Sequence, residues 1–186
     1  MNIIQNKWLA AFIIAFALIA NACTEQEEAN KTKITKSELL KHINDLSDSI
    51  ALPMDAAMAK KVSLELLRSC TEFADSYPED ERCAEYLFIA SRAAGGLGQY
   101  NKSLSILDRI KKGYNGYAKM PEVYFLYAFT LDEDLDQKEK AKEAYMELIN
   151  KFPGDPLSIQ SALLMDQLYL SDEELIEKWK NQNENQ

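Results

Sequence analysis

Histidine and cysteine are scarce in this 186-residue sequence, and their scarcity limits its chemistry. The chain contains one histidine, His42, and three cysteines, Cys23, Cys70 and Cys83, and none of them has the spacing of a zinc site. The glycine-rich segment 95–98 has no strand before it and no Lys-Ser/Thr pair after it, so it is a turn and not a phosphate-binding loop. The sequence therefore predicts no catalytic residue, no metal site and no cofactor.

Basic side chains are also few. The chain has 30 aspartates and glutamates against 21 lysines and arginines, a formal net charge of −9, and it contains no basic stripe. Because nucleic acids are bound through their phosphates, we do not expect this chain to bind them. Anionic lipid headgroups are disfavoured as a docking surface for the same reason. The expected partner is a protein or a peptide.

The first 22 residues indicate how the protein reaches a membrane. Lys7 precedes an apolar run, Trp8–Ile19, which is shorter than the about 20 residues of a membrane-spanning helix. The small residues 20–22 lead into Cys23, and this pattern resembles the lipobox of bacterial lipoprotein precursors, whose cysteine is acylated after the signal is removed. The resemblance implies a signal peptide at 1–22 and an outer-membrane lipoprotein anchored through Cys23. An ordinary secreted protein is the alternative.

Residues 23–36 are expected to form a flexible tether, because they are polar and apolar periodicity begins only at Leu39. Glu25, Glu27 and Glu28 follow the acylation site closely. They are either a solvated spacer or an address, since acidic residues behind the lipidated cysteine resemble the surface-export signal of Bacteroidota lipoproteins. The protein is accordingly expected to face the periplasm or to be exposed at the cell surface.

Residues 37–180 are expected to form one all-α domain, since apolar residues recur at steps of three and four and no strand alternation is visible. Capping sequences mark helix starts at 35–38, Asp55 and 171–174, and proline or glycine marks helix ends. The Asn- and Gln-rich residues 181–186 are expected to be a frayed tail. Helices are predicted from Ser37 to before Pro53, from Asp55 to Tyr77, over 84–94, around 104–110, after Pro121, over 139–152, over 158–169 and after Ser171.

These predicted helices repeat along the chain. Tyr77, Tyr114 and Phe152 each end a predicted helix, and they follow one another at spacings of 37 and 38. A shift of 38 also aligns small residues with small ones and large residues with large ones. The aligned pairs are Ala90 with Ala128, Leu87 with Phe125, Ser103 with Ala141, Leu107 with Tyr145, and Ile110 with Leu148. Small residues at such places allow antiparallel helices to approach closely, so Ala128 and Ala141 are predicted to be packing positions.

The segments 98–103, 140–145 and 152–155 resemble tetratricopeptide repeats, with two full repeats at 84–117 and 121–155. This resemblance implies an α-solenoid of antiparallel helix pairs. Together with the lipobox, it resembles the repeat lipoproteins of the Tol–Pal-associated YbgF-like family, although the amino-terminal coiled coil of that family is absent. It implies a lipid-anchored envelope scaffold that binds a protein or peptide on a concave face, with an outer-membrane assembly or a Tol–Pal-like system as its expected setting.

A concave groove is predicted on the first helices of the two full repeats. Two phenyl rings one helical turn apart would provide an apolar anchor, and acidic residues at the rim would favour a basic or amphipathic peptide. The predicted groove residues are Leu87, Ser91, Arg92, Phe125, Phe129, Asp132 and Glu133. The alternative for the two rings is a place in the core, where aromatic residues at helical spacing usually lie.

Two further questions stay open at the level of sequence. Cys70 and Cys83 either form a disulfide, which an envelope compartment permits, or are small buried apolar residues. The protein is expected not to be an enzyme. The alternative is an enzyme, or an accessory subunit of an envelope enzyme, whose active site the motifs do not reveal.

Overall fold

The computed structural model describes residues 34–50, 52–171, 173–174, 176–177 and 180–181. The predicted signal peptide, Cys23, most of the predicted tether and residues 182–186 lie outside the described residues. The chain divides into two units, Met1–Thr35 and Lys36–Gln186, and the second contains all the helices described below. Within the described residues the fold is all-α, as predicted, with seven α-helices, one π-helix and no strand. None of the described helices is long and apolar enough to cross a membrane.

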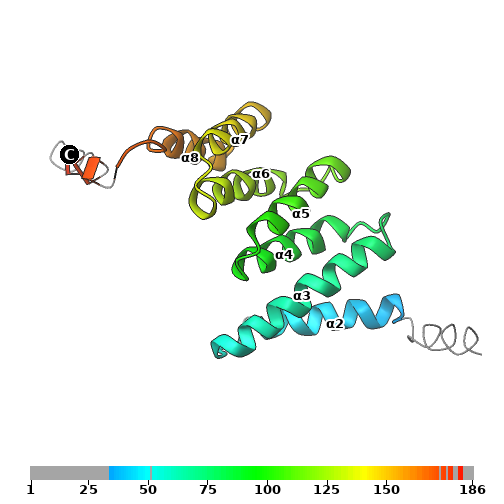
Figure 1. The fold of residues 1–186 in the computed structure, drawn as a ribbon. Helices are drawn as coiled ribbons and strands as arrows, with labels where there is room; N and C mark the ends of the chain where they lie inside the picture. Colours follow the sequence, from blue (N-terminus) through cyan, green and yellow to red (C-terminus); the bar gives the residue numbers. More distant parts are fainter. Residues whose placement is uncertain (1–33, 51, 172, 175, 178–179, 182–186) are drawn as a thin grey trace, which may run out of the picture. The chain divides into compact units, whose positions relative to one another are not determined.

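Helices that are neighbours in sequence pack against one another along this unit (Figure 1). Short turns join them, so that consecutive helices form pairs and the first helix of one pair packs on the last helix of the pair before. The elements are α2 (Lys36–Ile50), α3 (Ala56–Ser76), α4 (Cys83–Gly96), α5 (Tyr100–Gly113), α6 (Met120–Phe129), the π-helix η1 (Thr130–Asp134), α7 (Lys138–Lys151) and α8 (Pro156–Met165).

Local capping explains where several helices begin. The carboxylate of Asp55 accepts a hydrogen bond of 2.8 Å from the N–H of Met58 at the start of α3, which satisfies a free donor of the first turn. Asp155 caps α8 in the same way. Ser171 and Glu174 exchange the reciprocal bonds of a capping box. The helix starts predicted at Asp55 and Ser171 are therefore confirmed.

The turns after α3, α5 and α7 share one backbone geometry. Their C-cap residues Tyr77, Tyr114 and Phe152 have φ and ψ of −137° and 57°, −133° and 53°, and −129° and 59°. Each donates its N–H to the carbonyl four residues earlier and accepts at its own carbonyl from the N–H three residues later. The predicted aromatic spacing is therefore a repeat in the structure as well as in the sequence.

The two described cysteines are free and buried. The thiol of Cys83 donates to the carbonyl of Tyr77 at 2.9 Å, and in the third turn the hydroxyl of Ser158 donates to the carbonyl of Phe152 at 2.8 Å. Burial raises the pKa of Cys70 to about 12, which makes its thiol unreactive. Of the two alternatives for the cysteines, the structure supports the second, that of small buried residues.

The second full repeat is one residue longer than the first, and η1 contains the extra residue. The N–H of Gln99 bonds to the carbonyl of Ala94, and the N–H of Gln137 bonds to the carbonyl of Leu131, both at 2.8 Å. This hydrogen bond at the end of the first helix therefore spans five residues in the first repeat and six in the second. Before η1 the repeats align with a shift of 37, and after it with a shift of 38. A π-helical turn is the usual form of a single insertion into an α-helix.

This insertion corrects the predicted alignment of the first helices by one residue. Ser91, and not Ala90, matches Ala128, and both are fully buried. Leu87 likewise matches Tyr124 and not Phe125. In the second helices the predicted alignment of Ser103 with Ala141 is confirmed, and these small residues are 1% and 0% exposed. The burial of Ala128 and Ala141 supports their prediction as packing positions.

Candidate functional site

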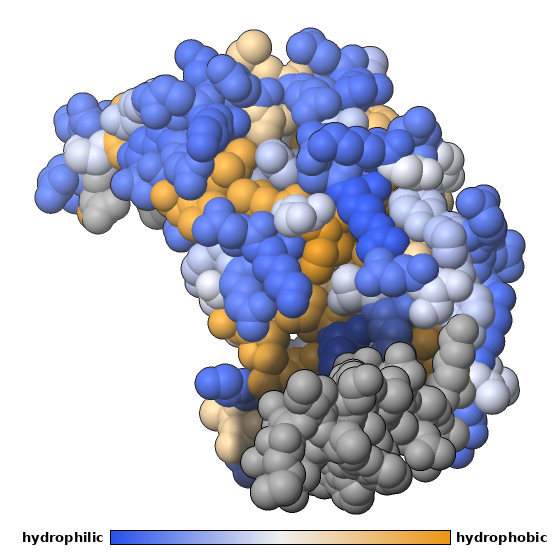
Figure 2. All heavy atoms as spheres, turned by 45° about the vertical axis from the view of Figure 1, so that its right-hand side comes forward, coloured by the Kyte–Doolittle hydropathy of each residue, from blue (hydrophilic) through white to orange (hydrophobic). Residues whose placement is uncertain are grey.

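Apolar side chains remain visible on one face of the protein, gathered in a hollow and bordered by hydrophilic side chains (Figure 2). Among the residues that the sequence predicts as a groove, four come from one stretch of chain, α6 and η1. These are Phe125, Phe129, Asp132 and Glu133. They are half-buried except for Glu133, which is exposed. We take this α6–η1 surface, defined by these four residues, as the candidate site.

The apolar part of the α6–η1 surface is a pair of phenyl rings. Phe125 and Phe129 lie one helical turn apart, and their rings stack with centroids 5.8 Å apart and planes inclined by 22°. The ring of Phe125 also lies 6.3 Å from that of Tyr145 in α7. Phe125 therefore joins the surface to the core, whereas no described ring other than that of Phe125 pairs with Phe129. Both rings are half-buried, so neither lies fully in the core, and their place in a groove stays a prediction.

The acidic part of the surface lies on the π-helix. The hydroxyl of Tyr145, which is fully buried, donates to a carboxylate oxygen of Asp132 at 3.3 Å. Burial and then the neighbouring negative charge of Glu133 raise the pKa of Asp132. A cation placed beside Asp132 would relieve both effects, because it would compensate for the lost hydration and offset the repulsion.

A cavity of about 320 Å³ opens beside these carboxylates. Leucines from the end of α8 and the residues after it form its apolar wall, and Lys138 is the one cationic residue among those that line it. The Nζ of Lys138 is 4.0 Å from a carboxylate oxygen of Asp136. The lining residues are Asp132, Glu133, Asp136, Lys138, Leu164, Gln167, Leu168 and Leu170. Their chemistry suits a cationic group with an aliphatic stem.

The structure corrects two of the predicted groove residues. Leu87 and Ser91 are both fully buried in α4, and the hydroxyl of Ser91 donates to the carbonyl of Phe88 at 2.7 Å. They are core residues. The prediction assigned them to the groove because its alignment was wrong by one residue, and one residue along a helix changes the direction of a side chain by about 100°. Arg92 is exposed, and it lines a different cavity of about 300 Å³ that is formed with residues of α2 and α3.

Sequence reasoning missed the contributions that Tyr145, the end of α8 and the residues after α8 make to the candidate site. It assigned Tyr145 to packing, and it assigned no role to Leu164, Leu168 or Leu170. One signal was available: the spacing of the repeat lengthens from 37 to 38 in the copy that contains Asp132. Such an insertion indicates an irregular helix, and π-helical turns are frequent at functional sites.

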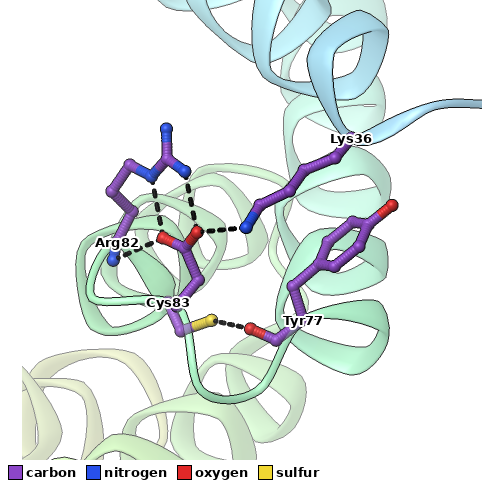
Figure 3. Close-up of polar contacts among 5 residues, drawn as sticks. Lys36, Tyr77, Arg82 and Cys83 are labelled. Carbon is purple, nitrogen blue, oxygen red and sulfur yellow. Dashed lines mark hydrogen bonds and ion pairs between the residues drawn. The ribbon is translucent and has the colours of Figure 1, made fainter.

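A second polar cluster joins the start of α2 to the turn between α3 and α4 (Figure 3). The side chain of Asp80 accepts two bonds of 2.7 Å from the guanidinium of Arg82 and lies 2.7 Å from the Nζ of Lys36. The bonds to Arg82, followed by that to Lys36, hold the pKa of Asp80 well below its usual range. Asp80 already has two cationic partners, Lys36 and Arg82, and its side chain is only 7% exposed. The cluster therefore holds the start of α2 against the turn between α3 and α4 and is a poor candidate for ligand binding.

Among the described residues, no group of three or more histidine, cysteine, aspartate or glutamate side chains is placed to hold a metal ion. The structure thus defines an all-helical protein of sequentially packed helices with an apolar and acidic surface on α6 and η1. No protein-family model matches the sequence, and no curated protein matches it significantly.

Proposed function

We propose that the protein is a lipid-anchored scaffold of the bacterial cell envelope whose tetratricopeptide-like helix pairs bind a protein or peptide. Three features support the repeat assignment: the common turn geometry at Tyr77, Tyr114 and Phe152, the buried small pair Ser103 and Ala141, and the packing of consecutive helices. Stacked helix pairs expose extended surfaces, and proteins built this way generally use them for binding.

The observation that carries the binding proposal is the meeting of apolar and acidic groups on the α6–η1 surface. The stacked rings of Phe125 and Phe129 are apolar contact area that is already ordered, so a partner would bind them at little entropic cost. Asp132 and Glu133 follow on the next turn, and the 320 Å³ cavity opens beside them. A peptide with an apolar side chain next to a lysine or arginine fits both parts.

The anchoring part of the proposal rests on the sequence. Acylation at Cys23 would attach the chain to the outer membrane, and the tether 23–36 would lead into α2, whose first residue, Lys36, is fixed to Asp80. Stable anchoring needs more than one acyl chain. The acidic residues behind Cys23 would act as a spacer or as a surface-export address.

Selection from a displayed library of short random peptides tests the binding proposal. The wild-type chain should enrich peptides with an apolar residue beside lysine or arginine, and the variant Phe129→Ser with Glu133→Lys should lose that enrichment. Leu64→Ser with Glu72→Lys is the matched control, because it removes an exposed apolar residue and reverses an exposed acidic one on α3. Equal enrichment by the wild type and both variants would remove the α6–η1 surface as the binding site.

A further inference from the structure

A second cavity, of about 300 Å³, lies between α2, α3 and α4, and we call it the α2–α4 cavity. Its wall is mostly apolar and is formed by Ile50, Leu66, Ile89 and Ala93. Leu66 and Ala93 are buried and Ile89 is half-buried. Ligand pockets are usually apolar with a few polar groups and have volumes of about 300–1,000 Å³. The α2–α4 cavity is at the lower end of this range, so it suits a small apolar group.

Three polar side chains, Ser47, Ser63 and Arg92, line the same cavity. The hydroxyl of Ser47 donates to the carbonyl of Ile43 in its own helix at 2.8 Å. Serine within a helix commonly bonds to the carbonyl four residues earlier in this way. Ser63 is half-buried, and its hydroxyl makes no hydrogen bond to any described residue. The guanidinium of Arg92 likewise has no hydrogen bond or ion pair within the described part of the chain. Ser63 and Arg92 can therefore both bond to a ligand.

The charge of Arg92 determines which ligands suit the cavity. Arg92 is the only charged residue among those that line it. Its charge also acts on Glu85, but the carboxylate of Glu85 is already bonded to the Nζ of Lys119 at 2.8 Å and to the hydroxyl of Tyr117 at 2.7 Å. A bound anion would therefore break no ion pair of Arg92. Because the chain has a net charge of −9, a singly charged anion is favoured over a multiply charged one.

The matching positions of the next helix pair carry different chemistry. At the shift of 37 between the repeats, Arg92 in α4 matches Phe129 in α6, and Ser63 in α3 matches Tyr100 in α5. The guanidinium is thus at a position where the next pair has a phenyl ring. The hydroxymethyl group of Ser63 is at a position where it has a phenol ring, and the smaller side chain leaves space that a ring would fill. The α2–α4 cavity is therefore a feature of the first pairs and is not common to every repeat.

We propose that the α2–α4 cavity binds a small aliphatic monocarboxylate. The aliphatic chain contacts Leu66, Ile89 and Ala93, and the carboxylate accepts hydrogen bonds from the guanidinium of Arg92 and the hydroxyl of Ser63. A guanidinium can bind a carboxylate through two parallel N–H bonds, which fixes its orientation. Burial of the chain favours a longer aliphatic anion over acetate. The cavity contains no residue of the α6–η1 surface, so this site does not depend on the proposed peptide binding.

Methyl NMR of the full chain in detergent micelles at neutral pH tests the site. Hexanoate should shift the methyl resonances of Leu66 and Ile89 in a saturable manner. Hexanamide has the same chain without the charge, and acetate has the charge without the chain. Both should bind several-fold more weakly than hexanoate. The methyl groups of Leu163, which is 59% exposed on α8, report any general effect of these compounds on the micelle and should not show the saturable shift.

Two variants and a matched control connect the binding to the named side chains. Arg92→Gln should weaken hexanoate binding several-fold at an unchanged melting temperature, because Arg92 is exposed. Arg68→Gln removes another exposed arginine, which lies outside the cavity, and should leave hexanoate binding unchanged. Ser63→Leu should fill the cavity and also weaken binding. If Ser63→Leu does not fold, Arg92→Gln still decides the outcome.

Three results would overturn the proposal. The first is the absence of saturable shifts at Leu66 and Ile89, and the second is equal binding of hexanoate and hexanamide. The third is equal binding of hexanoate by the wild type and Arg92→Gln. A short peptide that ends in leucine offers the same carboxylate and an aliphatic group. If this peptide shifts the two methyl resonances and hexanoate does not, the cavity binds a chain terminus and the proposal is wrong.

Discussion

Replacing Ala128 with leucine should destabilise the protein by overfilling the contact between α6 and α7. Ala128 in α6 and Ala141 in α7 are both fully buried and belong to one core cluster with Tyr145. An isobutyl group in place of the methyl group of Ala128 has no solvent-exposed side to which it can move. The helices would have to separate or neighbouring side chains would have to leave their preferred rotamers.

The size of the effect follows from this burial. Overpacking a close-packed core costs about 1–3 kcal/mol. For a chain of this length, each kcal/mol shifts the melting temperature by about 2–4 °C. We therefore expect the melting temperature of Ala128→Leu to fall by about 2–12 °C.

Thermal unfolding followed by circular dichroism measures this shift. Ala57→Leu is the control, since Ala57 is exposed on α3 and both residue types favour helices. The control should melt within about 1–2 °C of the wild type, as surface substitutions usually do. If Ala128→Leu melts like the control, Ala128 is not at a close helix contact and the corrected alignment of the repeats is wrong.

Three further changes have definite expected outcomes. Cys83→Ser should keep the melting temperature within a few degrees, because Ser158 makes the same bond with a hydroxyl, whereas Cys83→Val should lower it more; equal melts would show that the bond is unimportant. Asp80→Asn should lower the melting temperature at neutral pH. The pKa of Asp80 is depressed in the fold, so its stabilisation is present above the ordinary carboxyl pKa of about 4 and is lost as the pH falls below it; the difference from the wild type should therefore vanish in acid, and a constant difference would argue against ion pairing as its cause. Cys23→Ala should release the protein from membranes after signal cleavage, and its persistence in the membrane pellet would refute acylation as the anchor.

The helices themselves could be predicted from the sequence because their signals are local. Asp55 caps α3 within four residues, and the aromatic C-caps Tyr77, Tyr114 and Phe152 recur in the sequence at the spacing of the turns. The alignment of the second helices could also be predicted, since the small residues Ser103 and Ala141 and the large residues Leu107 and Tyr145 all match at one shift of 38. Such features need no knowledge of tertiary contacts.

The candidate site could be predicted only in part because it depends on helix rotation. A single inserted residue turns every earlier position by about 100° relative to the later ones, and nothing local fixes where an insertion lies between Ala128 and Gln137. The prediction aligned both helices of the repeats with a single shift of 38 and so assigned Leu87 and Ser91 to the groove. Phe125 and Phe129 were assigned to the groove from their places three residues before and one residue after Ala128, and both are half-buried on α6; their role in binding stays a prediction.

The burial of Cys70 and Cys83 shows a second limit of prediction from the sequence. The compartment that the predicted signal peptide implies would permit a disulfide, but the distance between two side chains depends on how the helices pair. Cys70 lies within α3 and Cys83 begins α4, and each has its own place in the core. The turn geometry brings the thiol of Cys83 to the carbonyl of Tyr77 as a hydrogen-bond donor, and Ser158 makes the equivalent bond in the third turn.

The most direct test of the account is a charge exchange at the α6–η1 surface. A fluorescently labelled peptide with phenylalanine beside lysine, and its counterpart with glutamate in place of lysine, would be titrated with the wild-type chain and with Glu133→Lys, and binding would be followed by anisotropy. The account predicts that the wild type prefers the lysine peptide, that the preference weakens as the pH falls through the raised pKa of Asp132, and that Glu133→Lys shifts preference toward the glutamate peptide. Equal affinity of both chains for both peptides would contradict it.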